Sequence, residues 1–300
     1  MTPQPLLVLA PPFGDASRVA AMFGAHPQAV LLPELHLTMA DTIGRLLDLC
    51  TIAQAGLEDG LLRAVAVLFC GGDVDANSIE RAREWLLRRA DRGTEDLLWE
   101  FAERTAPRQL VVPDTSVGWR PDTLRLLDAM FPDANWLHVV SHPRVYCGLA
   151  VAQLRKRLFI APDFRDARID PPLIDPQLAW LRVHANIDRA AAARPGRLRR
   201  LRVEQLYAEP ETTLEACCDW LGWDRSATSV AAMMHPERTP FATPGPLGAQ
   251  YGLETEFIES PWFARRLKPQ VSLDGPLDWR RDGLGFGDEL RDLAGTYGYR

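Results

Sequence analysis

Short apolar runs along the chain predict strands. Leu6–Leu9, Val30–Leu32, Leu110–Val112 and Trp136–Val140 are runs of this kind, and Leu198–Val203 is expected to be a fifth strand. Such runs, bounded by turn-forming residues, are typical of strands buried on both faces of a sheet.

Between these runs, apolar residues recur at helical spacing. The helices expected on this basis are Arg18–Phe23, Ile43–Cys50, Leu61–Phe69, Ile79–Arg89, Leu97–Glu103, Pro121–Met130, Val145–Lys156, Gln177–Ala192, Pro210–Leu221 and Glu289–Thr296. Strands that alternate with helices predict an α/β fold, in which a parallel sheet is covered by helices on both faces.

Two segments interrupt this alternation. Residues 41–105 hold several helical patterns in succession, which predicts a helical insert that forms a lid or a wall of the acceptor site. Residues 235–285 are rich in Pro, Gly and Trp and show little periodicity, so residues 235–300 are expected to wrap around the core as a C-terminal tail. Residues 1–300 together have the length of one α/β domain with an insert.

Charge and composition narrow the possible partners and location. The chain has 34 basic and 40 acidic residues and a net charge of −6, which argues against nucleic acid or an anionic membrane as a partner. No apolar run approaches the length of a membrane span, and Met1–Pro5 lacks the basic start of a signal peptide. We therefore expect a cytoplasmic protein.

The cysteines and histidines carry no metal signature. The 5 cysteines have no C-x-x-C spacing, and two of them are adjacent, so they are interpreted as reduced thiols. The histidines lack ligand spacing relative to one another or to cysteine, and no metal is expected.

The first turn is laid out like an anion-binding loop. Leu6–Leu9 leads through Ala10–Ser17, which contains Gly14, into the first expected helix. A strand, a glycine-containing turn and a helix direct free backbone N–H groups at an anion. However, this turn has no Arg or Lys, and Asp15 could itself occupy the N–H groups as a carboxylate ligand or as a simple N-cap.

Polar residues follow the expected strands, where a parallel sheet builds its site. Glu34 and His36 follow the second strand at a spacing of two, which places them on the same side of an extended segment. Glu34 could be a general base or cap a helix, and His36 could be a second acid/base group or a core or surface histidine.

Other candidates follow the third and fourth strands. Asp114 and Ser116 end the third strand, and Asp114 could form an acid/base pair with a histidine. His142 follows the fourth strand and could contact a substrate or stabilise a turn. Trp119 and Trp262 are candidates for lining an apolar substrate pocket.

Several motifs occur in the order found in bacterial PAPS-dependent sulfotransferases, and the chain resembles that family. The matching segments are Ala25-His26-Pro27, Pro33-Glu34, Phe131–Ala134 followed by Ser141–Arg144, Arg202–Leu206 with Pro210, Cys217–Gly222, Trp279-Arg280 and Gly298-Tyr299. The match covers most of the chain outside residues 41–105.

The resemblance implies a fold, an activity and a set of site residues. The fold would be a P-loop-like three-layer α/β domain with a parallel sheet, and the activity would be sulfuryl transfer from PAPS. Glu34 would be the general base. His36 and Asp114 as further catalytic candidates, and His142, Ser116 and Trp119 as substrate candidates, rest on their positions in the sequence and not on the resemblance. The positions aligned with PAPS contacts are Phe13, Gly14, Asp15, Ala16, Ser17, Ser141 and Arg144.

Most of those positions depart from the family pattern. Phe13 stands in place of an Arg, Asp15 in place of a Gly, and Ala16 in place of a hydroxyl residue. Ser141 replaces an Arg and Leu149 a Ser at the positions that hold the 3′-phosphate, whereas Arg144 is retained. Losing these donors predicts that PAPS is bound weakly or not at all.

The sequence is compatible with three alternative functions. The first is a biosynthetic sulfotransferase-like enzyme acting on a hydroxyl or amine of a bacterial secondary metabolite, free or carrier-bound, with PAPS use in doubt. The second is an enzyme on the same fold that no longer uses PAPS and carries out acid/base or group-transfer chemistry, such as cyclisation or acyl transfer. The third is a non-catalytic binding protein. Fold alone does not choose among them.

Overall fold

A five-stranded parallel sheet forms the centre of the protein. The computed structural model describes residues 2–53 and 56–300. The strands lie in the order β2-β3-β1-β4-β7, with bounds β1 Leu6–Leu9, β2 Ala29–Leu31, β3 Gln109–Asp114, β4 Asn135–Val140 and β7 Leu198–Arg202. All four pairings are parallel, which confirms the α/β class expected from the sequence.

Alternate residues of the strands face opposite layers. Leu6 and Val8 of β1 belong to one buried cluster, whereas Leu7 and Leu9 belong to another. Both faces are apolar because both are covered by helices, and this explains why the strands appear in the sequence as continuous apolar runs.

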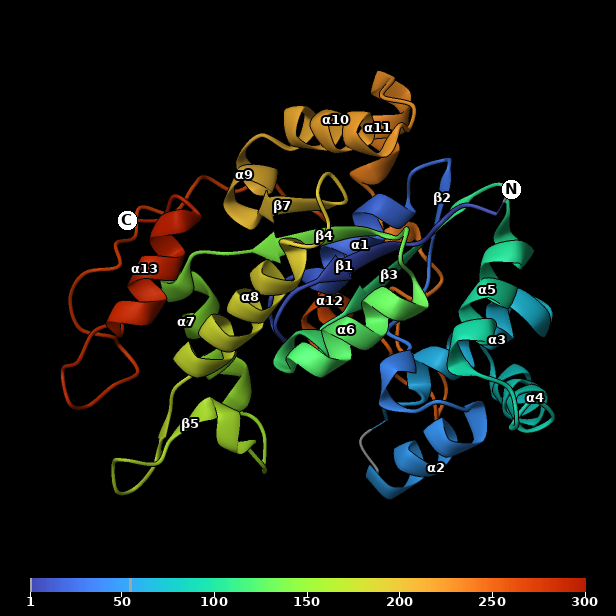
Figure 1. Ribbon diagram of the computed structural model, residues 1–300, viewed down its shortest axis with the longest axis horizontal. Helices are drawn as coiled ribbons and strands as arrows, with labels where there is room; N and C mark the ends of the chain where they lie inside the picture. The colour runs from blue at the N-terminus through green and yellow to red at the C-terminus, as the bar shows by residue number, and fades with distance from the viewer. Residues whose placement is uncertain (1, 54–55) are drawn as a thin grey trace.

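The helices form a layer on each face of the sheet (Figure 1). One layer contains α1 Ala16–Gly24, α9 Val203–Ala208, α10 Pro210–Leu221, α11 Ala227–Met233 and α12 Thr255–Glu259. The other contains α6 Pro121–Met130 and α8 Gln177–Ala191, which adjoin the short turns η1 Leu37–Met39 and η2 Val117–Trp119.

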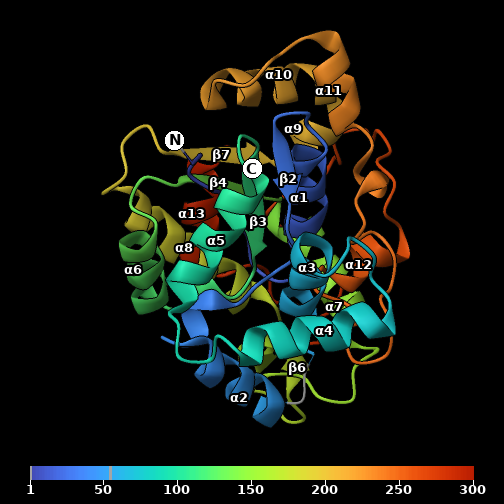
Figure 2. The same cartoon turned by 90° about the vertical axis from the view of Figure 1, so that its right-hand side faces the viewer.

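Residues 41–105 fold into four helices beside the β2 edge, on the right of Figure 1. They are α2 Ile43–Ala53, α3 Asp59–Phe69, α4 Ala76–Leu87 and α5 Thr94–Thr105. Helix α4 begins three residues earlier than its apolar pattern predicts, because Asp75 and Ser78 form a reciprocal capping box. In Figure 2 α3 and α4 face the viewer, and the C-terminal segment packs against α3 where Gly252 meets Gly60.

The C-terminal segment covers the opposite edge. Helix α7 Pro143–Leu154 and helix α13 Asp288–Thr296 share a third buried cluster with Trp180 and with tail residues such as Leu273 and Trp279. A small hairpin, β5 Arg165–Asp166 and β6 Leu173–Ile174, follows η3 Pro162–Phe164 in an Asp- and Pro-rich segment for which the sequence analysis predicted neither helix nor strand. Among the described residues, no helix combines the length and hydrophobicity required of a membrane span.

Candidate active site

Glu34 lies at the carboxyl edge of the sheet, where β2 and β3 end side by side. Its Oε1 accepts a hydrogen bond from the backbone N–H of Thr115 and another, 2.7 Å long, from the Thr115 hydroxyl. In the described chain, no residue donates to Oε2 of this partly buried side chain. Burial raises the pKa of Glu34, and the nearby Asp114 carboxylate raises it further, against the opposing effects of His36 and Thr115.

Three more of the expected residues lie beside Glu34. His36 Nδ1 is 3.4 Å from the Ser116 hydroxyl, and that hydroxyl donates to Asp114 Oδ1 at 2.9 Å. The same Asp114 oxygen accepts from the backbone N–H groups of Ser116 and Val117, both at 2.8 Å. The structure therefore brings Glu34, His36, Asp114 and Ser116 together, with Asp114 holding the turn that presents Ser116.

Backbone strain is concentrated at the same edge. In the described ranges, the non-glycine residues with positive φ are Phe13, Asp15 and His36, at 69°, 63° and 53°. This region of conformational space is unfavourable for residues with a Cβ, and bulky residues such as phenylalanine rarely adopt it. Two of the three residues are in the first loop and one follows Glu34. The fold therefore holds both segments in energetically unfavourable backbone conformations.

The first loop already binds a carboxylate of the chain itself. Glu254 Oε1 accepts from the Phe13 N–H at 2.8 Å and Glu254 Oε2 from the Ser17 N–H at 3.0 Å. The Ser17 hydroxyl in turn accepts from the Glu254 N–H at 2.8 Å. Burial raises the pKa of Glu254 to about 8, although the Ser17 N–H opposes the shift.

The expectation that the Asp15 side chain would occupy these N–H groups is wrong. Asp15 is the N-cap residue of α1, but its left-handed backbone turns the carboxylate away and it makes no capping bond. The carboxylate lies 3.6 Å from Arg18 Nε and accepts a long bond of 3.5 Å from the Tyr207 hydroxyl. Burial raises its pKa in spite of the nearby arginines.

Phe13 belongs to an aromatic cluster rather than to a polar loop. Its ring lies edge-on to Phe164 at 5.9 Å, and Trp119 lies edge-on to the same Phe164 ring at 5.6 Å. The Arg157 guanidinium lies 5.0 Å from the centre of the Phe13 ring. The cluster joins three segments that are distant in sequence. Gly14 follows Phe13 in the loop, and Ala16 is the first residue of helix α1.

The residues after β4 are engaged with the C-terminal tail. Arg144 donates to the carbonyl oxygens of Ser272, Asp274 and Pro276 at 2.7–2.9 Å. His142 caps α7 by accepting the Arg144 N–H at 3.1 Å, as the turn-stabilising alternative predicted, and burial lowers its pKa to about 4.

Ser141 and two other candidates lie apart from the Glu34 group. The Ser141 side chain is buried, and its carbonyl accepts from Trp180 Nε1 at 3.0 Å. Leu149 is 51% exposed on α7, and Trp262 is exposed on the tail.

Two motif residues with no assigned function explain part of this packing. Glu204 Oε1 accepts from the His142 N–H at 2.6 Å, and its Oε2 accepts from the Tyr299 hydroxyl at 2.9 Å. The two matching segments therefore meet near the end of β4, where the Glu204–Tyr299 hydrogen bond attaches residues 298–299 to the sheet. These segments are Arg202–Leu206 and Gly298-Tyr299.

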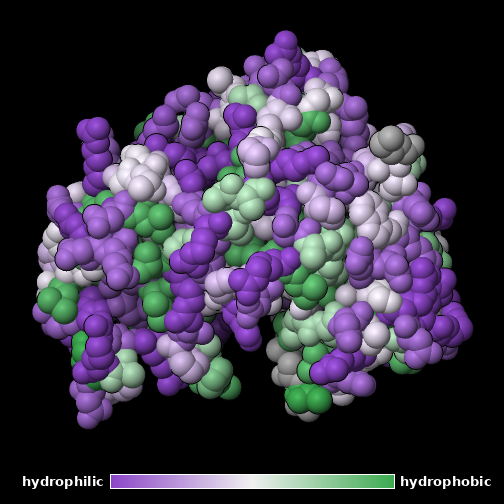
Figure 3. Space-filling view, in the orientation of Figure 1, coloured by the Kyte–Doolittle hydropathy of each residue, from purple (hydrophilic) through white to green (hydrophobic). Residues whose placement is uncertain are grey.

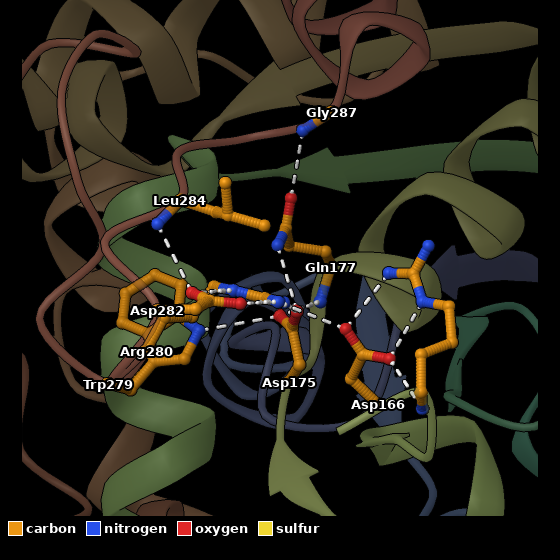
Figure 4. Close-up of polar contacts among 9 residues, drawn as sticks. Asp166, Asp175, Gln177, Trp279, Arg280, Asp282, Leu284 and Gly287 are labelled. Atoms are coloured by element: carbon orange, nitrogen blue, oxygen red, sulfur yellow. Dashed lines mark hydrogen bonds and ion pairs between the residues drawn. The ribbon is translucent and has the colours of Figure 1, made fainter.

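A buried ion cluster holds the tail against the hairpin segment (Figure 4). Arg280 is enclosed by three carboxylates: Asp175, Asp166 at 3.0 Å and Asp282 at 2.5 Å. Arg168 pairs with Asp166 from the solvent side. Because Phe164 immediately precedes the hairpin, this cluster also fixes the aromatic group that contacts Phe13.

The surface is hollowed between the lobe that carries β5 and the lobe that carries α2, at the lower edge of Figure 3.

Within the described residues, no group of three or more His, Cys, Asp or Glu side chains has an arrangement that could hold a metal ion.

Comparison with known proteins identifies the family. The sequence matches the profile described as the Sulfotransferase family over residues 17–227. The chain belongs to the sulfotransferase family. It is a transferase of that family, although the comparison with curated protein sequences found no significant match.

Two solved structures share the whole fold. The sulfotransferase domain from the curacin biosynthetic pathway superimposes with a TM-score of 0.78 at 17% identity, covering 99% of this chain and 98% of that one. The sulfotransferase domain from the Synechococcus PCC 7002 olefin synthase gives 0.74 at 19% identity, covering 100% and 98%. At these identities the similarity concerns the fold.

The family typically uses PAPS as donor, and in this structure several groups aligned with PAPS contacts already have partners within the chain. The Phe13 and Ser17 N–H groups are bound to Glu254, and the Arg144 guanidinium is bound to tail carbonyls. A phosphate at the first loop would therefore have to displace the Glu254 side chain from these two donors.

The sequence analysis missed two residues of this site. Glu254 lies in a segment without periodicity, and 237 positions separate it from Ser17, so no local pattern indicates their contact. Phe164 lies in the Asp- and Pro-rich segment for which neither helix nor strand was predicted. The single sequence signal was Phe13 itself, an apolar residue in a loop that should be polar.

Proposed function

We propose that the protein is a biosynthetic enzyme of the sulfotransferase family in which Glu34 removes a proton from a hydroxyl or amine of a small-molecule acceptor. The observation that carries this proposal is the arrangement of the Glu34 carboxylate, held through one oxygen by Thr115 while the other has no described partner. The origin of the two similar domains, a curacin biosynthetic pathway and an olefin synthase, supports a biosynthetic role and an acceptor that is free or carrier-bound.

The surroundings of Glu34 suit a general base. Thr115 fixes the orientation of the carboxylate, so Oε2 can meet the acceptor proton without loss of side-chain entropy. Burial raises the pKa of Glu34 towards the range in which a carboxylate is an effective base near neutral pH. His36 and Ser116 would orient the acceptor, and Asp114 would position Ser116 rather than react.

The aromatic cluster would receive the apolar part of the acceptor. Phe13, Phe164 and Trp119 come from the β1 end, the segment before the hairpin and the β3 end, so the cluster adjoins the carboxyl edge of the sheet. Rings held in edge-to-face contact offer apolar area with little conformational freedom to lose on binding. The Arg157 guanidinium over Phe13 would add a cation at the entrance.

A second candidate function, chemistry without PAPS, is favoured by one specific observation. The Glu254 carboxylate lies where the first loop would hold an external anion. Under this alternative, Glu34 and the aromatic cluster keep their roles, and the acceptor undergoes acid/base or group-transfer chemistry without a nucleotide.

Product analysis separates these functions. The protein is incubated with alcohols and amines of biosynthetic type, free and carrier-bound, with and without PAPS, and products are identified by mass spectrometry. We expect Glu34→Gln to reduce turnover by about 10²–10⁴-fold, and Glu259→Gln, an exposed carboxylate on α12, to leave it unchanged.

Each other outcome has a defined meaning. Unchanged turnover in Glu34→Gln contradicts the role of Glu34. Products that form without PAPS favour the second function, and acceptor binding without any turnover favours a non-catalytic binding protein.

A further inference from the structure

The contact between Glu254 and the first loop has the form of a bound anion. Two backbone N–H groups, of Phe13 and Ser17, each donate to a different oxygen of the carboxylate at 2.8 and 3.0 Å. Turn and helix N–H groups directed at one point are the usual means of binding phosphate or sulfate. The carboxylate therefore uses the same donors that an external oxyanion would need.

The segment that carries Glu254 is built to deliver it. Asp59 on α3 accepts the Tyr251 N–H at 3.0 Å, and Arg63 on the same helix donates to the carbonyls of Tyr251 and Thr243, both at 2.7 Å. Gly252 adopts φ +105°, and a Cβ there would lie 2.4 Å from the Gly60 Cα. This close approach brings the segment against α3 two residues before Glu254.

The same segment also occupies the basic residue of α1. Arg18 is buried and donates to the carbonyls of Ser260 and Trp262 at 2.7 and 2.8 Å. Its Nε lies 3.6 Å from Asp15. Neither the Phe13 and Ser17 N–H groups nor the Arg18 guanidinium is therefore free for an external anion.

We propose that Glu254 is a built-in competitor of the first loop, so that a sulfate or phosphate group binds there only when Glu254 withdraws. The helical insert takes part, because Asp59 and Arg63 on α3 hold the segment in place. This inference rests on the loop geometry and not on the role proposed for Glu34. It makes Glu254 the residue that determines whether this chain accepts an anionic donor.

The simpler alternative is that Glu254 serves only as a helix cap. Removing a cap lowers stability by about 0.5–2 kcal/mol and creates no affinity for anions. Removing a competitor exposes two aligned donors, which should then bind the anion. Stability alone does not separate the alternatives, whereas anion affinity does.

The test is an NMR titration of the full-length protein with sodium sulfate and, separately, with adenosine 3′,5′-bisphosphate. The readout is the amide resonances of Phe13 and Ser17. In the wild type we expect no saturable shift with millimolar sulfate. In Glu254→Ala we expect saturable shifts. The affinity for the anion should be at least about tenfold higher than in the wild type, which is equivalent to about 1.4 kcal/mol.

Controls keep the result decisive. Glu259→Ala removes an exposed carboxylate from the same α12 helix and should behave as wild type. Glu254→Gln keeps the size of the side chain and serves if the alanine variant does not fold. Wild-type affinity equal to that of the variants would overturn the proposal, as would a folded Glu254 variant without any anion binding. Sulfate probes the loop without a 3′-phosphate, and no step requires turnover, so the result is independent of the Glu34 proposal.

Discussion

The two halves of the carboxyl edge of the sheet differ in what occupies their polar groups. At the ends of β2 and β3, Glu34 is positioned by Thr115 and retains an oxygen without a described partner. At the ends of β1 and β4, the loop N–H groups bind Glu254 and the Arg144 guanidinium binds tail carbonyls. The first half holds the carboxylate that we propose as the general base, and the second half is filled by the chain's own C-terminal segment.

If Glu254 competes for the first loop as we propose, the tail closes an anion site without loss of the fold. Buried polar groups need partners, and the tail supplies them where a ligand otherwise would. The parallel sheet, the first turn and the motif residues Glu204 and Tyr299 remain in place. A change of ligand therefore requires little more than a tail carboxylate that reaches the loop.

The largest expected effect concerns the attachment of the tail. Arg280→Met would leave Asp166, Asp175 and Asp282 without their buried cation, whose side chain is 3% exposed. We expect unfolding by urea to show a loss of about 3–5 kcal/mol, the usual result of breaking a buried ion cluster. Arg168→Met, which removes an 85% exposed side chain, should lower the free energy of unfolding far less. If Arg280→Met and Arg168→Met lost the same free energy of unfolding, the tail would be loosely held and the second half of the sheet edge would be open.

A smaller effect is expected at the Glu34 half, and it should depend on pH. The Thr115 hydroxyl donates to Glu34 at 2.7 Å and favours the ionised form. Thr115→Val should therefore cost about 1.5–3 kcal/mol when Glu34 is ionised and less when it is protonated. We expect the difference in unfolding free energy from wild type to be larger at pH 9 than at pH 5.

The sign follows from the raised pKa of Glu34. A folded protein that holds a proton which the unfolded chain releases loses stability as pH rises between the two pKa values. Removing a donor to the carboxylate raises the folded pKa further, so the variant loses more. Thr123→Val is the matched control, because its hydroxyl donates to the neutral carbonyls of Val117 and Arg120. A pH-independent loss in Thr115→Val would show that Glu34 does not titrate in this range.

The smallest effect on stability is expected in the first loop, at Asp15. Asp15 has φ 63°, which glycine adopts without strain and alanine does not. Both Asp15→Gly and Asp15→Ala remove the carboxylate, so the difference between them isolates the backbone. We expect the glycine variant to be more stable by about 1 kcal/mol in thermal unfolding. Equal stability would show that the first loop relaxes and that its strain is not imposed by the surrounding segments.

Local patterns in the sequence predicted the sheet and the first half of the edge. The strands were visible because both of their faces are buried, and Glu34, His36, Asp114 and Ser116 follow directly from strand ends. In a parallel sheet those ends meet at one edge, so position along the chain translates into position in space.

The second half could not be predicted in this way. Glu254 reaches the loop from a segment without periodicity, and its placement depends on contacts of Tyr251 and Gly252 with α3. Phe13 was recognised as a departure, but its partner Phe164 was not. The role given to Asp15 was wrong because a left-handed backbone, invisible in the sequence, turns its carboxylate away from the helix.

The position of the last residues in the core has a consequence for biosynthesis. Leu290, Ala294, Tyr297 and Tyr299 are buried in the cluster that also contains Val140 of β4, and the Tyr299 hydroxyl binds Glu204. During translation, β4 and α7 emerge long before these partners exist, so their apolar faces stay uncovered until residues 290–299 have emerged. The nascent chain must therefore remain protected from aggregation until that segment is available to fold against β4.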